Sequence, residues 1–179
     1  MSNDTSMLVK LSRMDNHTAK MMGSDTVGIC KAFGFAPRLE NEAQTREEAN
    51  IFGYRAEFAV ARLLELETPA LNYLSDGGVD LWMDDIPIDV KFTNQEYGPL
   101  IFDTIQKFRS RLAVLVGRTE RDDVMRINGW ILRKDFRENC KRRDFGYGER
   151  LYMEHNDLSP IETLWRYRME QRLAPDGDT

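Results

Sequence analysis

The stretch that most constrains the fold of this chain runs from Gly77 to Thr93 and reads GGVDLWMDDIPIDVKFT. Residues 79–83 and 86–93 are predicted to be β-strands with one buried face, because apolar and polar residues alternate from Val79 to Leu81 and from Ile88 to Thr93. Asp84-Asp85 separates the two runs. Because two residues are enough to connect antiparallel strands, the pattern predicts a β-hairpin that turns at Asp84-Asp85.

The predicted register gives one face of this hairpin an unusual set of charges. Asp89, Lys91 and Thr93 share a face of the second strand, because alternate side chains of a strand point the same way. Asp80 on the first strand then lies opposite Asp89, with about 5 Å between the two Cβ atoms. Facing carboxylates repel each other, whereas a divalent cation between them turns the repulsion into coordination. The register therefore predicts a metal site. The alternatives are a hairpin that merely carries charge and a longer turn, favoured by Pro87, that shifts the register.

An amphipathic helix is predicted just before the hairpin, in TREEANIFGYRAEFAVARLLELE (residues 45–67). Thr45 and Glu48 have the spacing of a capping box, and Pro69 ends the helix. Its apolar residues recur at helical spacing, so one face should be buried. Glu57 lies on the flank of that apolar stripe and could offer a third carboxylate to the hairpin.

The rest of the chain predicts further helices and strands around the hairpin. The expected elements are a strand at 70–74, a helix at 102–110, strands at 111–117 and 124–133, a helix at 134–143, a loop with a short strand at 144–157, and a last helix at 159–173 capped by Ser159 and Glu162. This order predicts an α/β fold, with a central mixed β-sheet flanked by helices and a C-terminal helical extension. We expect residues 1–44 to form a partly flexible N-terminal extension, residues 45–173 to form the folded domain, and residues 174–179 to form a flexible tail.

Composition excludes several classes of protein. No apolar run approaches the roughly 18 residues of a membrane span, and the polar N-terminus has no secretion signal, so we expect a cytoplasmic protein without a membrane partner. Cys30 and Cys140 have no CxxC partners, which argues against a zinc site. The chain has only two histidines, so histidine-driven hydrolysis is disfavoured.

The net charge is −5, yet residues 109–172 hold 15 basic and 11 acidic side chains. Such a distribution suits a metal site beside a phosphate-binding surface, or simply an unevenly charged, solvated surface.

Three segments together resemble the PD-(D/E)XK nuclease superfamily: GYRAEFAVARLL, GGVD and IDVKFT, in that family's order of helix, strand and strand. The resemblance covers roughly residues 47–132 and implies a restriction-endonuclease-like core. It also implies that Asp80 and Asp89 hold Mg²⁺, with Mn²⁺ able to substitute, and that Lys91 orients or activates the attacking water. Glu57 would add a further catalytic or metal contact, and Val90 belongs to the expected metal-contacting set.

The resemblance implies a metal-dependent DNA endonuclease of the small phage or mobile-element type, acting in recombination, junction resolution or restriction-like cleavage. If the chain is phage-encoded, it would work in the host cytoplasm. Many small relatives cut as dimers, so a homodimer is expected by analogy. One alternative is a catalytically silent relative that acts as a DNA-binding or anti-defence module, and another is a structural protein whose acids bind a metal only for stability. The set of Asp80, Asp89 and Lys91 favours the enzyme. The form of the DNA substrate stays open.

The arginine-rich segment RKDFRENCKRRDFGYGER is the first candidate for DNA binding. Arg137, Lys141, Arg142 and Arg143 lie within seven positions and are interleaved with aromatic residues, which suits phosphate contacts and base stacking. A surface helix with internal charge pairs is the alternative, in which case Arg109, Arg111 and Arg118 are the next candidates. Thr93 and Gln95 are candidates for contact with the scissile phosphate, although ordinary polar positions at a strand end are the favoured explanation.

Overall fold

The computed structural model describes residues 6–32, 46–69 and 78–174, with only the backbone described for residues 29–31. The expected strand at 70–74, the whole segment 33–45 including Thr45, and the tail from 175 onward lie outside the described residues. No helix in the described ranges is long and apolar enough to cross a membrane.

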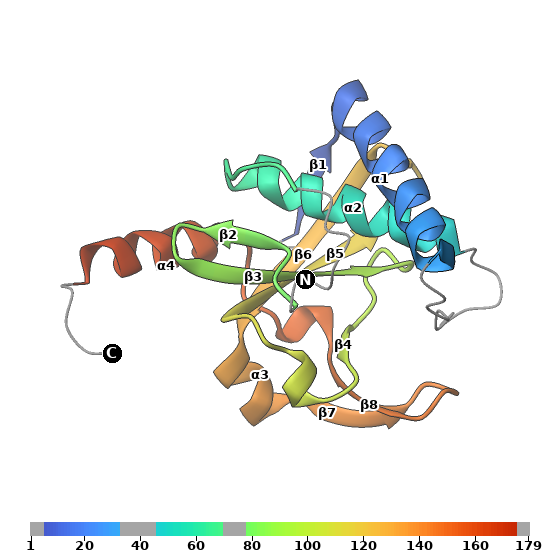
Figure 1. Cartoon of the computed structure of the whole chain (residues 1–179). Coiled ribbons are helices and arrows are strands. Elements are labelled where there is room, and N and C mark those ends of the chain that lie inside the picture. Colours follow the sequence, from blue (N-terminus) through green and yellow to red (C-terminus); the bar gives the residue numbers. More distant parts are fainter. Residues whose placement is uncertain (1–5, 33–45, 70–77, 175–179) are drawn as a thin grey trace.

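A five-stranded mixed sheet forms the centre of the molecule (Figure 1). Its strand order is β1-β6-β5-β3-β2, in which β3 and β5 run parallel and the other neighbours run antiparallel. The strands are β1 (Met7–Lys10), β2 (Leu81–Met83), β3 (Ile86–Thr93), β5 (Leu112–Arg118) and β6 (Val124–Leu132). The α/β class with a central mixed sheet flanked by helices is therefore confirmed.

Two helices cover one face of this sheet, and a smaller sheet covers the other (Figure 1). α1 (Arg13–Ala32) and α2 (Arg46–Leu63) form the helical layer. On the opposite side lie the second sheet, in the order β4-β8-β7, and α3. The elements of this second layer are β4 (Leu100–Phe102), η1 (Ile105–Lys107), α3 (Arg133–Asn139), β7 (Lys141–Asp144), β8 (Glu149–Met153) and η2 (His155–Asp157).

The sheet separates two apolar cores. The larger core lies between the main sheet and α1 and α2, and it contains Phe52, Val60, Ile88 and Ile127. The smaller core contains four phenylalanine or leucine side chains without solvent contact or nearly so: Leu100, Phe102, Phe108 and Phe136. The rings of Phe102 and Phe108 stack with their centroids 4.4 Å apart. The odd-numbered side chains of β3 therefore lie on the side of this second layer, where Asp89 is buried and Lys91 is partly exposed.

Part of the predicted N-terminal extension belongs to the larger core. β1 pairs with β6, and α1 packs along α2. Leu11, Ala19 and Met22 are buried there. These three positions do not produce a strong helical stripe in the sequence, because the helix buries small residues as well as large ones.

One predicted helix is wrong, a second ends four residues earlier than predicted, and one predicted cap is absent. Residues 102–110 form the end of β4 and the short turn η1, and residues 134–143 divide between α3 and the strand β7. Gly146 and Gly148 have positive φ angles of 97° and 102°, and they let the chain turn so that β7 pairs with β8. α4 (Glu162–Leu173) begins after Ile161 without a side-chain cap, because the backbone of Ser159 pairs with Trp130 instead.

Candidate active site and adjoining basic pocket

The β2–β3 hairpin has the register predicted from its alternation. Leu81 pairs with Ile88, Trp82 with Pro87 and Met83 with Ile86, which leaves Asp84 and Asp85 as the two-residue turn. Asp84 has a φ of 56°, a left-handed conformation that short polar residues tolerate. The register therefore continues toward Asp80 opposite Asp89.

Asp80 lies just before β2, and its carboxylate is held against the backbone of β3. The Asp80 amide donates to the Ile88 carbonyl at 2.9 Å, and Asp80 Oδ2 accepts a hydrogen bond from the Val90 amide at 2.6 Å. Val90 stands between Asp89 and Lys91 in the sequence. The Asp80 carboxylate consequently lies beside the two residues with which it was predicted to act.

Asp89 is buried and forms an ion pair with Lys91. The Asp89 side chain is 1% exposed, and its Oδ1 accepts a hydrogen bond from Lys91 Nζ. The Lys91 side chain is 37% exposed, and its ammonium lies 5.1 Å from the centre of the Phe102 ring. The ion pair confirms that Asp89 and Lys91 share a face, while Ile88 and Val90 belong to the larger core on the other side.

These oxygens suit a hard cation, but Glu57 does not complete a three-acid cluster with them. Mg²⁺ keeps several waters and is commonly bound by one or two carboxylates together with substrate phosphates, so the Asp80 and Asp89 pair fits its preferences. Among the residues that the structure describes, no group of three or more Asp, Glu, His or Cys side chains could hold a metal. Glu57 is half-buried on α2.

Thr93 and Gln95 lie at the end of β3 and in the loop that follows it. The Gln95 amide donates to the Thr93 hydroxyl at 3.3 Å. Gly98 packs so closely on the Thr93 side chain that a Cβ at residue 98 would overlap it. The Thr93 hydroxyl thus organises the loop, and its expected contact with a phosphate remains a prediction.

The predicted basic cluster of residues 137–143 divides between two places. Lys141 Nζ lies 3.4 Å from an Asp157 carboxylate oxygen, and Arg142 Nη1 lies 2.9 Å from a Glu149 oxygen. Arg143 lies over the Phe145 ring. All of β7 is exposed, so these three remain available at the surface although acids neutralise two of them. Arg137 lies apart from them, on α3.

Arg137 lines a basic pocket of about 610 Å³ at one end of the main sheet. The pocket is lined by the ends of β3, β5 and β6 and by α3 and α4: Pro87, Arg109, Ser110, Arg111, Leu132, Arg133, Lys134, Arg137, Tyr167 and Gln171. Five of these ten side chains are cationic and none is acidic. Backbone hydrogen bonds join the three strand ends, from the Arg111 amide to the Pro87 carbonyl at 3.1 Å and from the Arg133 amide to the Arg111 carbonyl at 2.9 Å.

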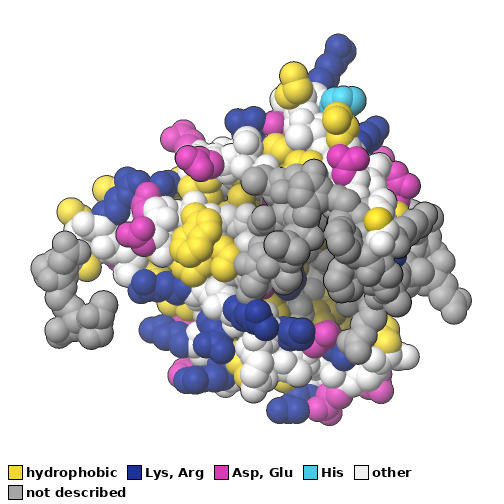
Figure 2. Space-filling view, in the orientation of Figure 1, with side chains coloured by type: hydrophobic (Ala, Val, Ile, Leu, Met, Phe, Trp, Pro, Cys, Tyr) yellow, Lys and Arg dark blue, Asp and Glu magenta, His cyan; other side chains and the backbone are white. Residues whose placement is uncertain are grey.

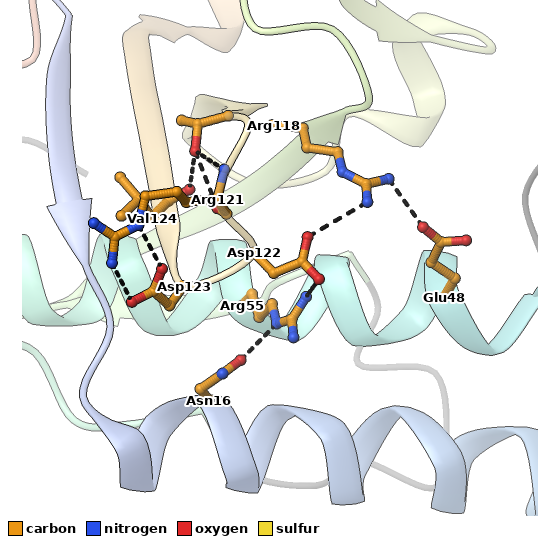
Figure 3. Close-up of polar contacts among 9 residues, drawn as sticks. Asn16, Glu48, Arg55, Arg118, Arg121, Asp122, Asp123 and Val124 are labelled. Carbon is orange, nitrogen blue, oxygen red and sulfur yellow. Dashed lines mark hydrogen bonds and ion pairs between the residues drawn. The ribbon is translucent and has the colours of Figure 1, made fainter.

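Arg118, the third of the alternative arginines, does not join this pocket. It pairs with Glu48 at 2.9 Å and with Asp122 at 3.5 Å, in a polar network on the helical side of the sheet (Figure 3). The buried Arg55 donates to Asn16 at 2.8 Å in the same network, and burial lowers the pKa of its guanidinium. The network ties α1 and α2 to the β5–β6 turn, which is a structural role.

The basic pocket adjoins the carboxylate hairpin. Ser110 Oγ donates to the Gly78 carbonyl at 2.6 Å, two residues before Asp80. Gly78 has a φ of 87°, and a Cβ there would lie 3.6 Å from Arg109 Cβ. Pro87 of the pocket precedes Asp89 by two residues, about 7 Å along an extended strand. The pocket and the carboxylate hairpin are therefore neighbours along β3.

Trp82 is the residue of this region that sequence analysis did not single out. It is 59% exposed on β2, between the buried Leu81 and Met83. The same alternation that placed Asp80 predicts that Trp82 points away from the larger core, so the signal was present in the pattern.

Searches against protein-family models, curated proteins and solved structures found no match for this chain.

Proposed function

We propose that this chain is a Mg²⁺-dependent deoxyribonuclease that hydrolyses phosphodiester bonds of DNA. The observation that carries the proposal is the grouping of Asp80, Asp89 and Lys91 on one side of β3, next to a pocket lined by five cations. An acidic site alone would repel a phosphate backbone. A cationic surface next to it offsets that repulsion.

In this proposal, the carboxylates of Asp80 and Asp89 would hold the metal. A bound divalent cation stabilises charge on the phosphoryl group and lowers the pKa of a coordinated water. The Val90 amide orients Asp80, which restricts the carboxylate to one position. Lys91, the partly exposed member, would position the attacking water through its ammonium.

A catalytically silent, nuclease-like DNA-binding module is the second candidate. Asp89 is almost completely buried and already has a cationic partner in Lys91, an arrangement that also serves as a purely structural ion pair. Under this alternative the basic pocket would bind DNA without cleavage.

Cleavage assays separate the two candidates. Supercoiled plasmid and labelled single-stranded, duplex and flapped oligonucleotides would be incubated with Mg²⁺, with Mn²⁺ and with EDTA. We expect cutting with either metal, none with EDTA, and none by a folded Asp89→Asn variant. If the wild-type protein binds DNA but cuts none of these substrates with either metal, the silent module is the better description.

A further inference from the structure

Trp82 and the basic pocket form one continuous surface. Trp82 is directly opposite Pro87, and cross-strand partners project from the same face of a hairpin. Pro87 lines the pocket. Figure 2 shows a hydrophobic patch over the β2–β3 hairpin, with Lys and Arg side chains gathered below it over α3. An indole therefore lies at the edge of a cationic cavity.

Within the part of the chain that the structure describes, the cations of this pocket have no ion pairs with carboxylates. Arg109, Arg133, Lys134 and Arg137 form no ion pair with any carboxylate of the described residues, in contrast to Lys141 and Arg142 on β7. Arg111 donates to the neutral Gln171 side chain at 2.7 Å. Cations that form no ion pairs raise the local positive potential and attract a polyanion.

We propose that this surface binds an unpaired strand of DNA, with one base stacked on Trp82 and the flanking phosphates in the basic pocket. The inference deepens the proposed function and rests on it, because it names the substrate class as DNA with a single-stranded segment. Unpaired bases offer a free π-face to an exposed aromatic side chain, whereas bases within a duplex are already stacked. The cavity of about 610 Å³ is large enough for a nucleotide-sized group.

Binding assays in EDTA test this surface without any cleavage. The fluorescence anisotropy of a labelled oligothymidylate and of a blunt duplex of equal length would be measured against protein concentration. We expect tighter binding of the single strand and quenching of tryptophan fluorescence. Trp82→Ala should weaken single-strand binding about 5- to 150-fold, which corresponds to about 1–3 kcal/mol for one stacked base. Trp82→Phe should retain part of the affinity.

A second pair of variants tests the pocket. Arg133→Ala combined with Lys134→Ala should weaken single-strand binding and reduce the slope of log K against log salt by about 0.7 for each lost phosphate contact. Arg13→Ala combined with Lys20→Ala removes the same charge from α1, on the other side of the sheet, and should change neither quantity. Pyrophosphate should compete weakly and should not quench the tryptophan fluorescence.

The single-strand binding inference can fail independently of the nuclease proposal. Binding is measured in EDTA, so single-strand affinity and its loss on Trp82→Ala do not depend on the metal or on cleavage. If wild-type protein cuts nothing but still loses single-strand affinity on Trp82→Ala, the binding surface stands and the nuclease activity fails. Unchanged single-strand affinity in both Trp82 variants, or pyrophosphate binding as tight as that of the oligonucleotide, would overturn the inference.

Discussion

Asp80 offers the most selective test of the carboxylate pair. An asparagine at residue 80 can still accept the Val90 amide hydrogen bond, so Asp80→Asn should fold while removing one negative charge beside Asp89. We expect loss of Mg²⁺-supported cleavage, with a melting temperature in EDTA equal to or higher than that of the wild-type protein. Mg²⁺ should raise the melting temperature of the wild-type protein only, because a ligand that binds the folded state stabilises it. Thermal scans with and without Mg²⁺ measure this, and an equal Mg²⁺ response in both proteins would exclude Asp80 as a ligand.

Lys91 offers a second test of the proposed site, through its ammonium group. If its ammonium works at the attacking water, Lys91→Ala should slow the single-turnover cleavage rate far more than it weakens DNA binding. The variant should also melt at a lower temperature, because the buried Asp89 loses its cationic partner. Rates should therefore be measured well below that temperature. Equal losses in rate and in affinity would instead assign Lys91 to DNA binding.

At the scale of elements, the hairpin is tied to the last helix through its turn. The Asp84 carboxylate accepts hydrogen bonds from Arg168 and Arg172 of α4 at 2.7–2.9 Å. These two guanidinium groups lower the pKa of Asp84 below its ordinary value of 3.8. α4 also lines the basic pocket through Tyr167 and Gln171, so the same contacts hold the pocket beside the hairpin.

The substitution Asp84→Asn should remove the negative charge and keep the conformation of the turn, since asparagine also tolerates a positive φ. A carboxyl whose pKa is lowered by folding stabilises the protein above its unfolded pKa, and this stabilisation disappears as pH falls through the folded pKa. At pH 7 we expect Asp84→Asn to reduce the free energy of unfolding by about 1 kcal/mol, a small value because the Asp84 side chain is partly solvated. This loss should lower the melting temperature by about 2–4 °C. The difference in stability between the wild-type protein and Asp84→Asn should shrink below about pH 4. Asp85→Asn, in the same turn, is the control and should have little effect. An Asp84→Asn difference that is the same at pH 3 and pH 7 would contradict the ion-pair explanation.

At the scale of the whole molecule, β7 and the basic pocket are the two candidate surfaces for the proposed DNA substrate. Changing Lys141, Arg142 and Arg143 together to Ala should weaken binding to all sequences alike and flatten the salt dependence by up to about 0.9 for each lost duplex contact. Because two of these residues are paired with acids, we expect a smaller loss than from the Arg133 and Lys134 double variant. Melting temperatures should change little, since exposed ion pairs contribute at most about 1 kcal/mol each. Titrations at several salt concentrations measure both quantities, and a larger loss from the β7 triple variant would make β7 the main DNA surface.

The sequence by itself determined the hairpin and the placement of its charged residues. A two-residue turn and a strict period of two leave one register in which Ile88 and Val90 are buried, and that register brings Asp80 toward Asp89. The helix that became α2 was predictable for the same reason, because its apolar stripe has a single period. In these segments, local geometry and burial point to the same structure.

Only the tertiary structure decided where the remaining segments lie. Residues 134–143 have a helical pattern throughout, yet pairing with β8 converts residues 141–144 into a strand. The basic pocket combines Arg109 and Arg111, just before β5, with Arg133 and Lys134, just after β6. Antiparallel pairing of β5 with β6 returns the chain to its starting edge, so residues more than twenty positions apart become neighbours. That proximity depends on long-range strand pairing, which no local period in the sequence encodes.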